Sequence, residues 1–356
     1  MPVSHGLYAE LSNMATQSND TDWGSSGREV NQVLSTVAGS LSIFGTIMIF
    51  ITFALWKDMR TTSRKILVFI SIGDLFTAMV NVSGVSMSST TGILDMTFCK
   101  IQSFVNIAAI LSSFFWTVYL SIFLYLSLCG LRREREKKVM FVFHVTAWGI
   151  PLIVALSAAS VGNAFGQTSI SDGWCWISRN LSSNLLLFWM FFAGKGWEIL
   201  SYLAITIFYI KAKIVLKRKM CSSSSTPFLT TASLVAARKA DRKFTMVPII
   251  FILLRMWGTI RFISYVVCLP ECKKTGPNLN PHIEFLLRIL HGVGDSSQGF
   301  ANFIIFCLFT DKIHYKIKLW CSRVCPFVKT HIADDKYNNY ESYSALDDSI
   351  NHPASK

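Results

Sequence analysis

The chain has 356 residues, of which 51% are hydrophobic and 15% are charged, with a mean hydropathy of +0.42. Soluble domains carry about 25% charged residues, so this composition excludes an ordinary soluble protein and favours a membrane protein. A net charge of +13 would suggest nucleic-acid binding in a soluble protein. Here the lysines and arginines lie in short segments between apolar runs, as membrane orientation requires, so no nucleic-acid partner is expected.

The apolar runs form a series that follows a polar N-terminal tail, residues 1–32. Each run has the roughly 20 residues that a helix needs to cross a bilayer. The seven predicted spans lie at 33–56, 66–88, 99–129, 139–161, 185–210, 244–269 and 283–309. The sequence therefore predicts an all-α membrane protein whose residues 33–309 form a seven-transmembrane helix bundle.

The positive charges between the spans predict the orientation of the bundle. If the N-terminus is outside, the inner segments contain 25 lysines and arginines and the outer segments contain 4. Because cytosolic loops carry the excess of these residues, we expect the N-terminus outside and the C-terminus in the cytosol. The outer segments also contain two glycosylation sequons, which start at Asn19 and Asn180.

Four cysteines lie at the outer ends of the predicted spans or in the outer loops. Cys99 begins the third span and Cys175 lies in the second outer loop, where an oxidising environment permits a disulfide between them. We predict that this bond forms. Cys268 and Cys272 flank the third outer loop, and they can either pair or remain free thiols.

Three inner segments have distinct compositions. Residues 211–243 have basic ends around a middle rich in serine and threonine, which predicts a flexible cytosolic loop. Residues 310–325 predict a short amphipathic eighth helix on the inner leaflet, where Cys321 and Cys325 are candidate palmitoylation sites. Residues 326–356 are polar and acidic, and we expect a disordered cytosolic tail.

The third predicted span carries a polar stripe on one helical face, formed by Asn106, Ser113, Thr117 and Ser121. A lipid-facing surface has no reason to collect hydroxyls and an amide. The stripe is expected to face other helices, either as hydrogen-bonding contacts between helices or as part of a functional site.

Chemistry within the membrane must come from the ionisable residues, because each is costly in hydrocarbon. The sequence has no recognisable catalytic motif, cofactor-binding loop or metal-ligand spacing among its nine cysteines, so no enzyme, cofactor or metal is predicted. Pairing between helices is the simplest interpretation of the intramembrane charges. Near the midplane we expect Glu198 to pair with Arg255, and Asp74 and Asp295 to join a polar network with Asn302.

The outer half of the bundle is predicted to hold more cations than acids. Three cations, Lys100, Arg261 and Arg288, lie at a level where Glu284 is the one acid in the predicted spans. We hypothesise a net-cationic pocket for an extracellular ligand that carries an anionic group. Its candidate residues are Lys100, Lys195, Glu198, Arg261, Glu284 and Arg288.

Several short motifs resemble those of secretin-like G-protein-coupled receptors. They are FFW at 114–116 with LYL at 124–126, WGIP at 148–151, CW at 175–176 and QGF at 298–300. The rhodopsin-like motifs DRY, CWxP and NPxxY are missing. The chain also lacks the large extracellular domains of secretin and adhesion receptors. A short tail on such a bundle is similar to the cAMP-receptor-like group, as are the tracts HVTAWGIPL, DGWCWI, GKGWE and VPIIFILLRMWGTIRF.

The resemblance implies a plasma-membrane receptor that transmits an unidentified extracellular ligand to a heterotrimeric G protein. It also implies that the cytosolic ends of the third, fifth and sixth spans contact the G protein. The residues that qualify are Arg132, Arg133, Arg135, Lys217, Arg218, Lys219, Arg242 and Lys243. The alternative is that these residues only anchor the orientation of the bundle. Pro248, near the inner end of the sixth span, would permit a hinge that opens a cytosolic cleft.

Other classes of seven-span protein fit the sequence less well. A retinal protein needs a lysine in the seventh span, and residues 283–309 contain none. A seven-span transporter is the alternative function. It would be expected to show an internal repeat, and none is visible between residues 33–129 and 185–309.

Overall fold

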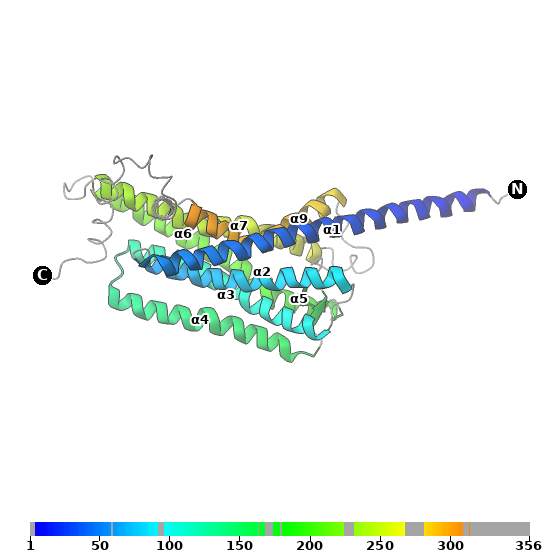
Figure 1. The fold of residues 1–356 in the computed structure, drawn as a ribbon, viewed down its shortest axis with the longest axis horizontal. Helices are drawn as coiled ribbons and strands as arrows, with labels where there is room; N and C mark the ends of the chain where they lie inside the picture. The colour runs from blue at the N-terminus through cyan, green and yellow to red at the C-terminus, as the bar shows by residue number, and fades with distance from the viewer. Residues whose placement is uncertain are drawn as a thin grey trace, which may run out of the picture.

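The computed structural model describes residues 4–57, 60–91, 96–162, 164–167, 174–178, 180–223, 231–267, 281–308 and 313. They form an elongated bundle of helices (Figure 1). The first four helices are α1 (Ser4–Leu55), α2 (Thr62–Thr91), α3 (Met96–Leu128) and α4 (Arg133–Ser160). The later helices are α5 (Ser183–Met190), α6 (Gly196–Ser223), α7 (Thr231–Val267), α9 (Pro281–Ser296) and α10 (Gln298–Phe303). Two π-helical turns, η2 (Phe191–Lys195) and η3 (Ile304–Leu308), join or end these helices.

Within the described residues, six helices are long and apolar enough to cross a membrane, and they match the first six predicted spans. The helix α1 is longer than predicted, because it begins at Ser4 and includes most of the polar tail. Its N-terminal part extends beyond the other helices (Figure 1). The seventh predicted span corresponds to α9, α10 and η3 together.

The seventh span was predicted as one continuous helix, and the structure breaks it at Ser297, between α9 and α10. On one side of the break, Gly294 allows close packing on α7, since a Cβ there would lie 2.1 Å from the carbonyl oxygen of Leu254. On the other side, the Gly299 amide donates to Ser42 Oγ of α1 at 2.9 Å. The first amides of a helix have no partner within it, so Ser42 satisfies one donor that the break exposes.

The fifth predicted span also departs from a regular helix. It runs through α5, the π-helical η2 and α6, which are continuous along the chain. Trp197 Nε1 donates to the carbonyl oxygen of Phe192 at 2.8 Å and satisfies an acceptor within this turn. Such π-helical turns occur frequently at functional sites. Here the turn ends at Lys195, a predicted pocket residue.

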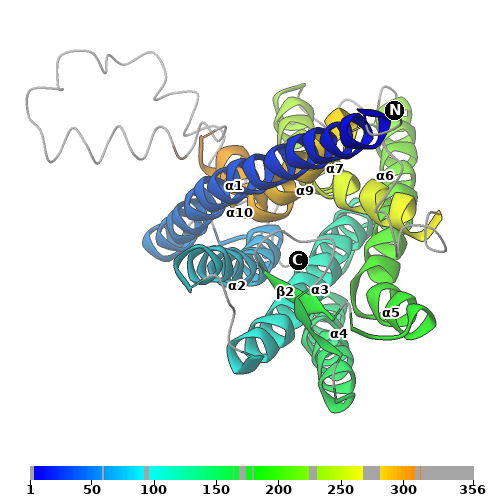
Figure 2. The ribbon, with the colours of Figure 1, turned by 90° about the vertical axis from the view of Figure 1, so that its right-hand side faces the viewer.

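A small hairpin was not expected in an all-α protein. Strands β1 (Phe165–Gln167) and β2 (Cys175–Ile177) pair antiparallel in the second outer loop. The predicted disulfide joins Cys99 at the start of α3 to Cys175, with the two Cα atoms 5.3 Å apart. Gln102 of α3 accepts a hydrogen bond from the Cys175 amide at 3.0 Å. The hairpin is thus held over the end of α3, which Figure 2 shows end-on.

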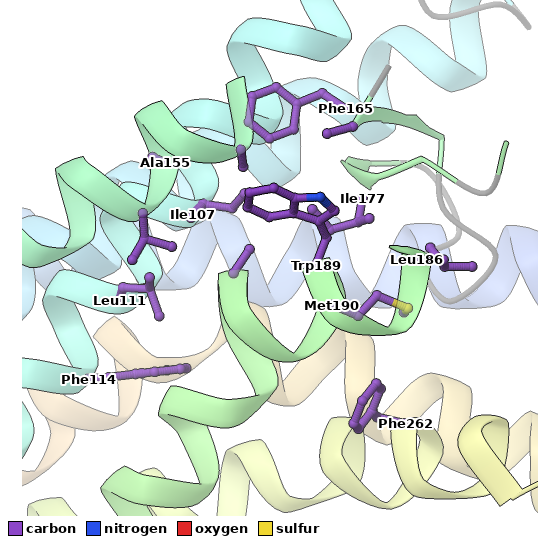
Figure 3. Close-up of a cluster of buried hydrophobic side chains, with 14 of the residues drawn as sticks. Ile107, Leu111, Phe114, Ala155, Phe165, Ile177, Leu186, Trp189, Met190 and Phe262 are labelled. Carbon is purple, nitrogen blue, oxygen red and sulfur yellow. The ribbon is translucent and has the colours of Figure 1, made fainter. Parts of the chain in front are cut away.

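The helix α3 is the centre of the bundle, where it packs against α2, α4, α6, α7 and the hairpin. Its polar stripe is buried, as predicted. Around its outer half lies an apolar cluster to which several elements contribute, including Ile107 of α3, Ile177 of β2 and Trp189 of α5 (Figure 3). A second cluster surrounds Trp116 and Leu120 at the inner half of α3. These two cores fix the height and rotation of α3 against its neighbours.

The third inner segment is more helical than predicted. Residues 211–223 continue α6 and residues 231–243 belong to α7, so the expectation of a flexible loop over 211–243 is wrong for both ends. The ends are rich in lysine, arginine and alanine, which are strong helix formers. Their charge, rather than this helix propensity, suggested a loop.

Some predictions fall outside the described residues. The predicted eighth helix at 310–325 does so except for residue 313, as do Cys321, Cys325 and the tail at 326–356. Cys268 and Cys272 also lie outside the described residues.

Candidate functional site

A buried cavity lies beneath the hairpin, at the end of the bundle predicted to be outside. Its volume open to the centres of water molecules is about 50 Å³, room for about three to five waters. Trp174 and Trp176 line it from the second outer loop, and Phe114 lines it from α3. The other lining residues come from α3, η2, α6, α7 and α9, and are Asn106, Ile107, Ile110, Ala193, Gly194, Lys195, Glu198, Arg255, His291 and Asp295.

Lys195 and Glu198 form an ion pair on one wall of this cavity, with Lys195 Nζ 2.9 Å from Glu198 Oε2. Both side chains are buried. The other carboxylate oxygen accepts a hydrogen bond from Tyr202 at 2.6 Å and another from the Thr259 hydroxyl of α7. Glu198 thus has three donors, which is what a buried carboxylate needs to remain charged.

Arg255 of α7 pairs with Asp295 of α9 on the opposite wall, where Nη1 lies 3.5 Å from Oδ1. The expected Glu198–Arg255 pair is therefore wrong. Each acid takes a nearer cation, since Lys195 lies one turn from Glu198 on the same helical column. His291 Nε2 lies 3.2 Å from the other oxygen of Asp295. The Arg255 guanidinium also lies over the Phe114 ring, 5.2 Å from its centre.

Gly258 of α7 makes room for the two walls to meet. A Cβ at this position would lie 2.6–2.7 Å from ring atoms of His291 and 2.9 Å from Lys195 Nζ. Side chains do not tolerate such distances, so the absence of a side chain lets α7, α9 and η2 bring their polar groups together. Gly258 also lies three residues after Arg255, within one helical turn of it.

A second charged layer lies toward the outer end of α7 and α9. Arg261 Nη2 lies 2.9 Å from Glu284 Oε1, and Arg288 Nη2 lies 3.7 Å from the same oxygen. Arg261 Nη1 lies 3.1 Å from His291 Nδ1, which connects this layer to the cavity. Because a guanidinium only donates, Nδ1 accepts here and the proton of the imidazole lies on Nε2, toward Asp295.

The net positive charge of the pocket stays a prediction, because only Lys195 and Glu198 of the six predicted pocket residues line the cavity. Lys100 is exposed at the outer end of α3 and does not line the cavity, although it was a predicted pocket residue. Among the other described groups of the two layers, four cations accompany three acids. They are Lys195, Arg255, Arg261 and Arg288 with Glu198, Glu284 and Asp295.

Asp74 belongs to a separate cluster, nearer the middle of the bundle. Ser113 of α3 donates to its Oδ1 at 2.7 Å, and Asn302 of α10 donates to its Oδ2 at 2.9 Å. The predicted contact between Asp74 and Asn302 is confirmed, but Arg255 and Asp295 belong to the cavity wall. Neutral donors from two helices therefore hold this buried carboxylate at the centre of α2.

Comparison with known proteins identifies the family. The sequence model of the slime mold cyclic AMP receptor family matches residues 24–227. The chain is 32% identical over 287 residues to G-protein coupled receptor 157 of Homo sapiens, over 79% of this chain and 81% of the relative. The chain belongs to the cyclic AMP receptor family. It is a G-protein-coupled receptor embedded in the membrane by several helices, and not an enzyme.

Other relatives agree with this assignment. Cyclic AMP receptor-like protein A of Dictyostelium discoideum is 28% identical over 172 residues, which cover 48% of this chain and 43% of that protein. The crystal structure of squid rhodopsin is similar with a TM-score of 0.65, covering 89% of this chain and 91% of that chain at 14% identity. At this identity the likeness concerns the fold alone. It supports the seven-helix receptor fold, with α9, α10 and η3 as the seventh column. The receptor relatives do not favour the transporter alternative.

The far end of the receptor carries the basic residues predicted to face a G protein. Arg132, Arg133 and Arg135 are exposed between α3 and the first turn of α4. Lys217 and Arg218 are exposed on α6. The backbone continues in helix through the three remaining positions, whose side chains lie outside the described part: Lys219, Arg242 and Lys243. The predicted hinge residue Pro248 is buried inside α7, and the helix runs through it without a break.

The two predicted glycosylation sites lie toward the cavity end. Asn180 is exposed just after β2, as a glycosylated asparagine must be. Asn19 lies in the projecting part of α1, and its side chain lies outside the described part.

Sequence reasoning missed several groups in and around the receptor's cavity. His291 received no role, although a histidine inside an apolar run is itself a signal. Tyr202 and Thr259 were missed because their function depends on the rotation of α6 and α7, which no single helix sequence contains. The two tryptophans beside Cys175 appeared only as part of a motif. Their place over the cavity depends on the disulfide and the hairpin.

Proposed function

We propose that this receptor lies in the plasma membrane with its N-terminus outside and binds a ligand with an anionic group in the cavity beneath the hairpin. It then activates a heterotrimeric G protein at the opposite, basic end of the bundle. The observation that carries the proposal is the charged, buried cavity, because ion pairs inside a membrane bundle are costly and mark functional sites.

The orientation is supported by two features at opposite ends. The Cys99–Cys175 disulfide lies at the cavity end, and disulfides persist in oxidising compartments such as the cell exterior. The exposed arginines after α3 lie at the other end, where the positive-inside rule puts the cytosol. Residues 310–325 are proposed as an inner-leaflet helix, and residues 326–356 as a cytosolic tail.

The anionic ligand is supported by the charges near the cavity. Two cations, Lys195 and Arg255, line the cavity, and an anionic group would bind between them. Arg255 Nε is buried and has no hydrogen-bond partner within the described part of the receptor.

G-protein activation is tested most simply in cells that express the receptor with each of the four Gα classes, with basal activity recorded. An N-terminal epitope, stained on intact cells, reports orientation and surface expression together. We expect staining of intact cells and nucleotide exchange above the vector control for at least one Gα class. A stained receptor that is silent with all four classes would contradict the proposal, and solute movement in cells without G protein would favour a transporter.

A further inference from the structure

The cavity contains hydrogen-bond donors that its own acids do not use. Lys195 Nζ carries three hydrogens, and within the described residues it donates one hydrogen bond, to Glu198. Arg255 Nε is without a partner within the described residues, although Arg255 is only 2% exposed. A buried donor without an acceptor costs about 1–3 kcal/mol, so an acceptor from a bound molecule would relieve this cost. Both cations therefore have capacity for an acceptor group in the cavity.

The acids can keep their charge while the cations turn toward a ligand. Glu198 retains its bonds from Tyr202 and Thr259 if Lys195 shares its ammonium with another acceptor. Asp295 likewise keeps His291 Nε2 at 3.2 Å and Arg255 Nη1 at 3.5 Å if Arg255 offers the ligand its unpartnered Nε. A ligand with a single anionic group can thus bind while both acids keep a partner. This matters because a buried charge without a partner is destabilising.

The rest of the cavity is aromatic and aliphatic. Trp176 packs closely on η2, since a Cβ on Gly194 would lie 2.7 Å from its ring. Trp174 lies beside His291, with the ring centres 6.3 Å apart. Phe114 is fixed from below by an edge-to-face contact with Phe251 at 5.2 Å. Three rigid rings around a small space favour a flat ring as the body of the ligand.

We propose that this cavity binds a compact aromatic acid, a single ring joined to a carboxylate by a short linker. The carboxylate lies between Lys195 and Arg255, and the ring lies among Trp174, Trp176 and Phe114. This inference rests on the proposed function, because it assigns a ligand class to the same cavity. The volume open to water centres, about 50 Å³, is smaller than this ligand needs, so its binding would widen the cavity.

The test uses the purified full-length receptor, whose unfolding temperature is measured against the concentration of phenylacetate. Two matched compounds separate the charge from the ring: phenylacetamide is neutral, and cyclohexylacetate is an acid without an aromatic ring. Phenylacetate should stabilise the receptor, with the amide weaker by about tenfold or more, since bonds to charged groups are the stronger ones. Cyclohexylacetate should be weaker by about threefold or more, from the lost aromatic contact.

Two variants locate the binding. Lys195→Gln should weaken the phenylacetate response about tenfold, whereas Lys100→Gln, the same change at an exposed position, should leave it within about twofold. Because Lys195→Gln can itself disturb folding, Ile110→Phe provides a second arm that fills the cavity and removes no charge. It should abolish the response without lowering the unfolding temperature of the ligand-free receptor.

The possible results separate the ligand class from the receptor function. Equal effects of phenylacetate and phenylacetamide, no stabilisation by phenylacetate, or an unchanged response in Ile110→Phe would each overturn the inference. Nucleotide exchange on a Gα subunit, measured on the same preparation without ligand, reports the proposed function by itself. Basal exchange without phenylacetate binding would reject the ligand class and keep the G-protein coupling, whereas loss of both would reject the proposed function as well.

Discussion

The two ends of this receptor hold their positive charges in opposite ways. At the cavity end, Lys195, Arg255 and Arg261 are buried, and each lies within 4 Å of a carboxylate oxygen. At the other end, the arginines at 132, 133 and 135 are exposed and make no ion pair within the described part of the chain. Buried charges are expensive unless paired, whereas exposed charges cost little to keep.

This difference indicates what each end is able to recognise. A buried, paired charge is shielded from water and can bind only a small group that enters its cavity. An exposed charge remains hydrated and suits a large partner or an anionic surface. It follows that substitutions at the cavity end should change stability, and those at the basic end should change partner binding while stability stays the same.

The largest effect is expected from Glu198→Gln, which leaves Lys195 buried without its acid. Breaking a buried pair on one side costs about 3–5 kcal/mol, so the unfolding temperature of the purified receptor should fall strongly. The double variant Lys195→Gln/Glu198→Gln removes both charges and should recover part of the loss, as a double-mutant cycle would show. A Glu198→Gln variant that loses less than about 1 kcal/mol would mean that water, rather than Glu198, compensates this lysine.

The next effect is expected from Cys99→Ser, which releases the hairpin from α3. Loss of a native disulfide costs about 2–4 kcal/mol of unfolding free energy, and the hairpin residues should become susceptible to proteolysis. Cys129→Ser is the matched control, since Cys129 is a free, exposed thiol at the opposite end of α3. Equal unfolding temperatures for the two variants would show that Gln102 and the apolar cluster hold the hairpin without the disulfide.

A smaller effect is expected from Gly258→Ala. The new Cβ would press on His291 and Lys195 and should cost about 1–3 kcal/mol, the range for overpacking a core. Gly149→Ala is the control, because a Cβ there meets nothing within 4 Å and alanine is the better helix former. Calorimetry of both variants measures the difference. A Gly258→Ala receptor as stable as Gly149→Ala would show that the two walls can separate freely.

The smallest effect on stability is expected at the basic end. Replacing Arg132, Arg133 and Arg135 together by glutamine should change the unfolding free energy by about 0.5 kcal/mol or less for each position, as for surface residues in general. Thermal unfolding of the purified triple variant checks this. A loss comparable with that of Gly258→Ala would show that these arginines support the fold, and the contrast between the two ends would then be lost.

The sequence predicts those features of the receptor fold that depend on the residues of a single segment. Seven apolar runs, the lysine and arginine asymmetry and the Cys99–Cys175 disulfide are all read from local composition and position. Three features were not predicted: the π-helical η2, the break at Ser297, and the ion pairs that Glu198 and Arg255 form with other residues instead of with each other. Each depends on how two or three helices are rotated against one another. Lys100 shows the same limit, since it lies near the start of α3, beside Cys99, but does not line the cavity.

The buried, paired end and the exposed, basic end are proposed to belong to one signalling receptor. The most direct measurement is nucleotide exchange on the responding Gα class by purified receptor in lipid discs, with the triple glutamine variant at 132, 133 and 135 against the unmodified receptor and Lys100→Gln. We expect the triple variant to remain folded and to lose most of its exchange activity, while Lys100→Gln keeps it. Full exchange by a folded triple variant would contradict the claim and leave these arginines as anchors of membrane orientation.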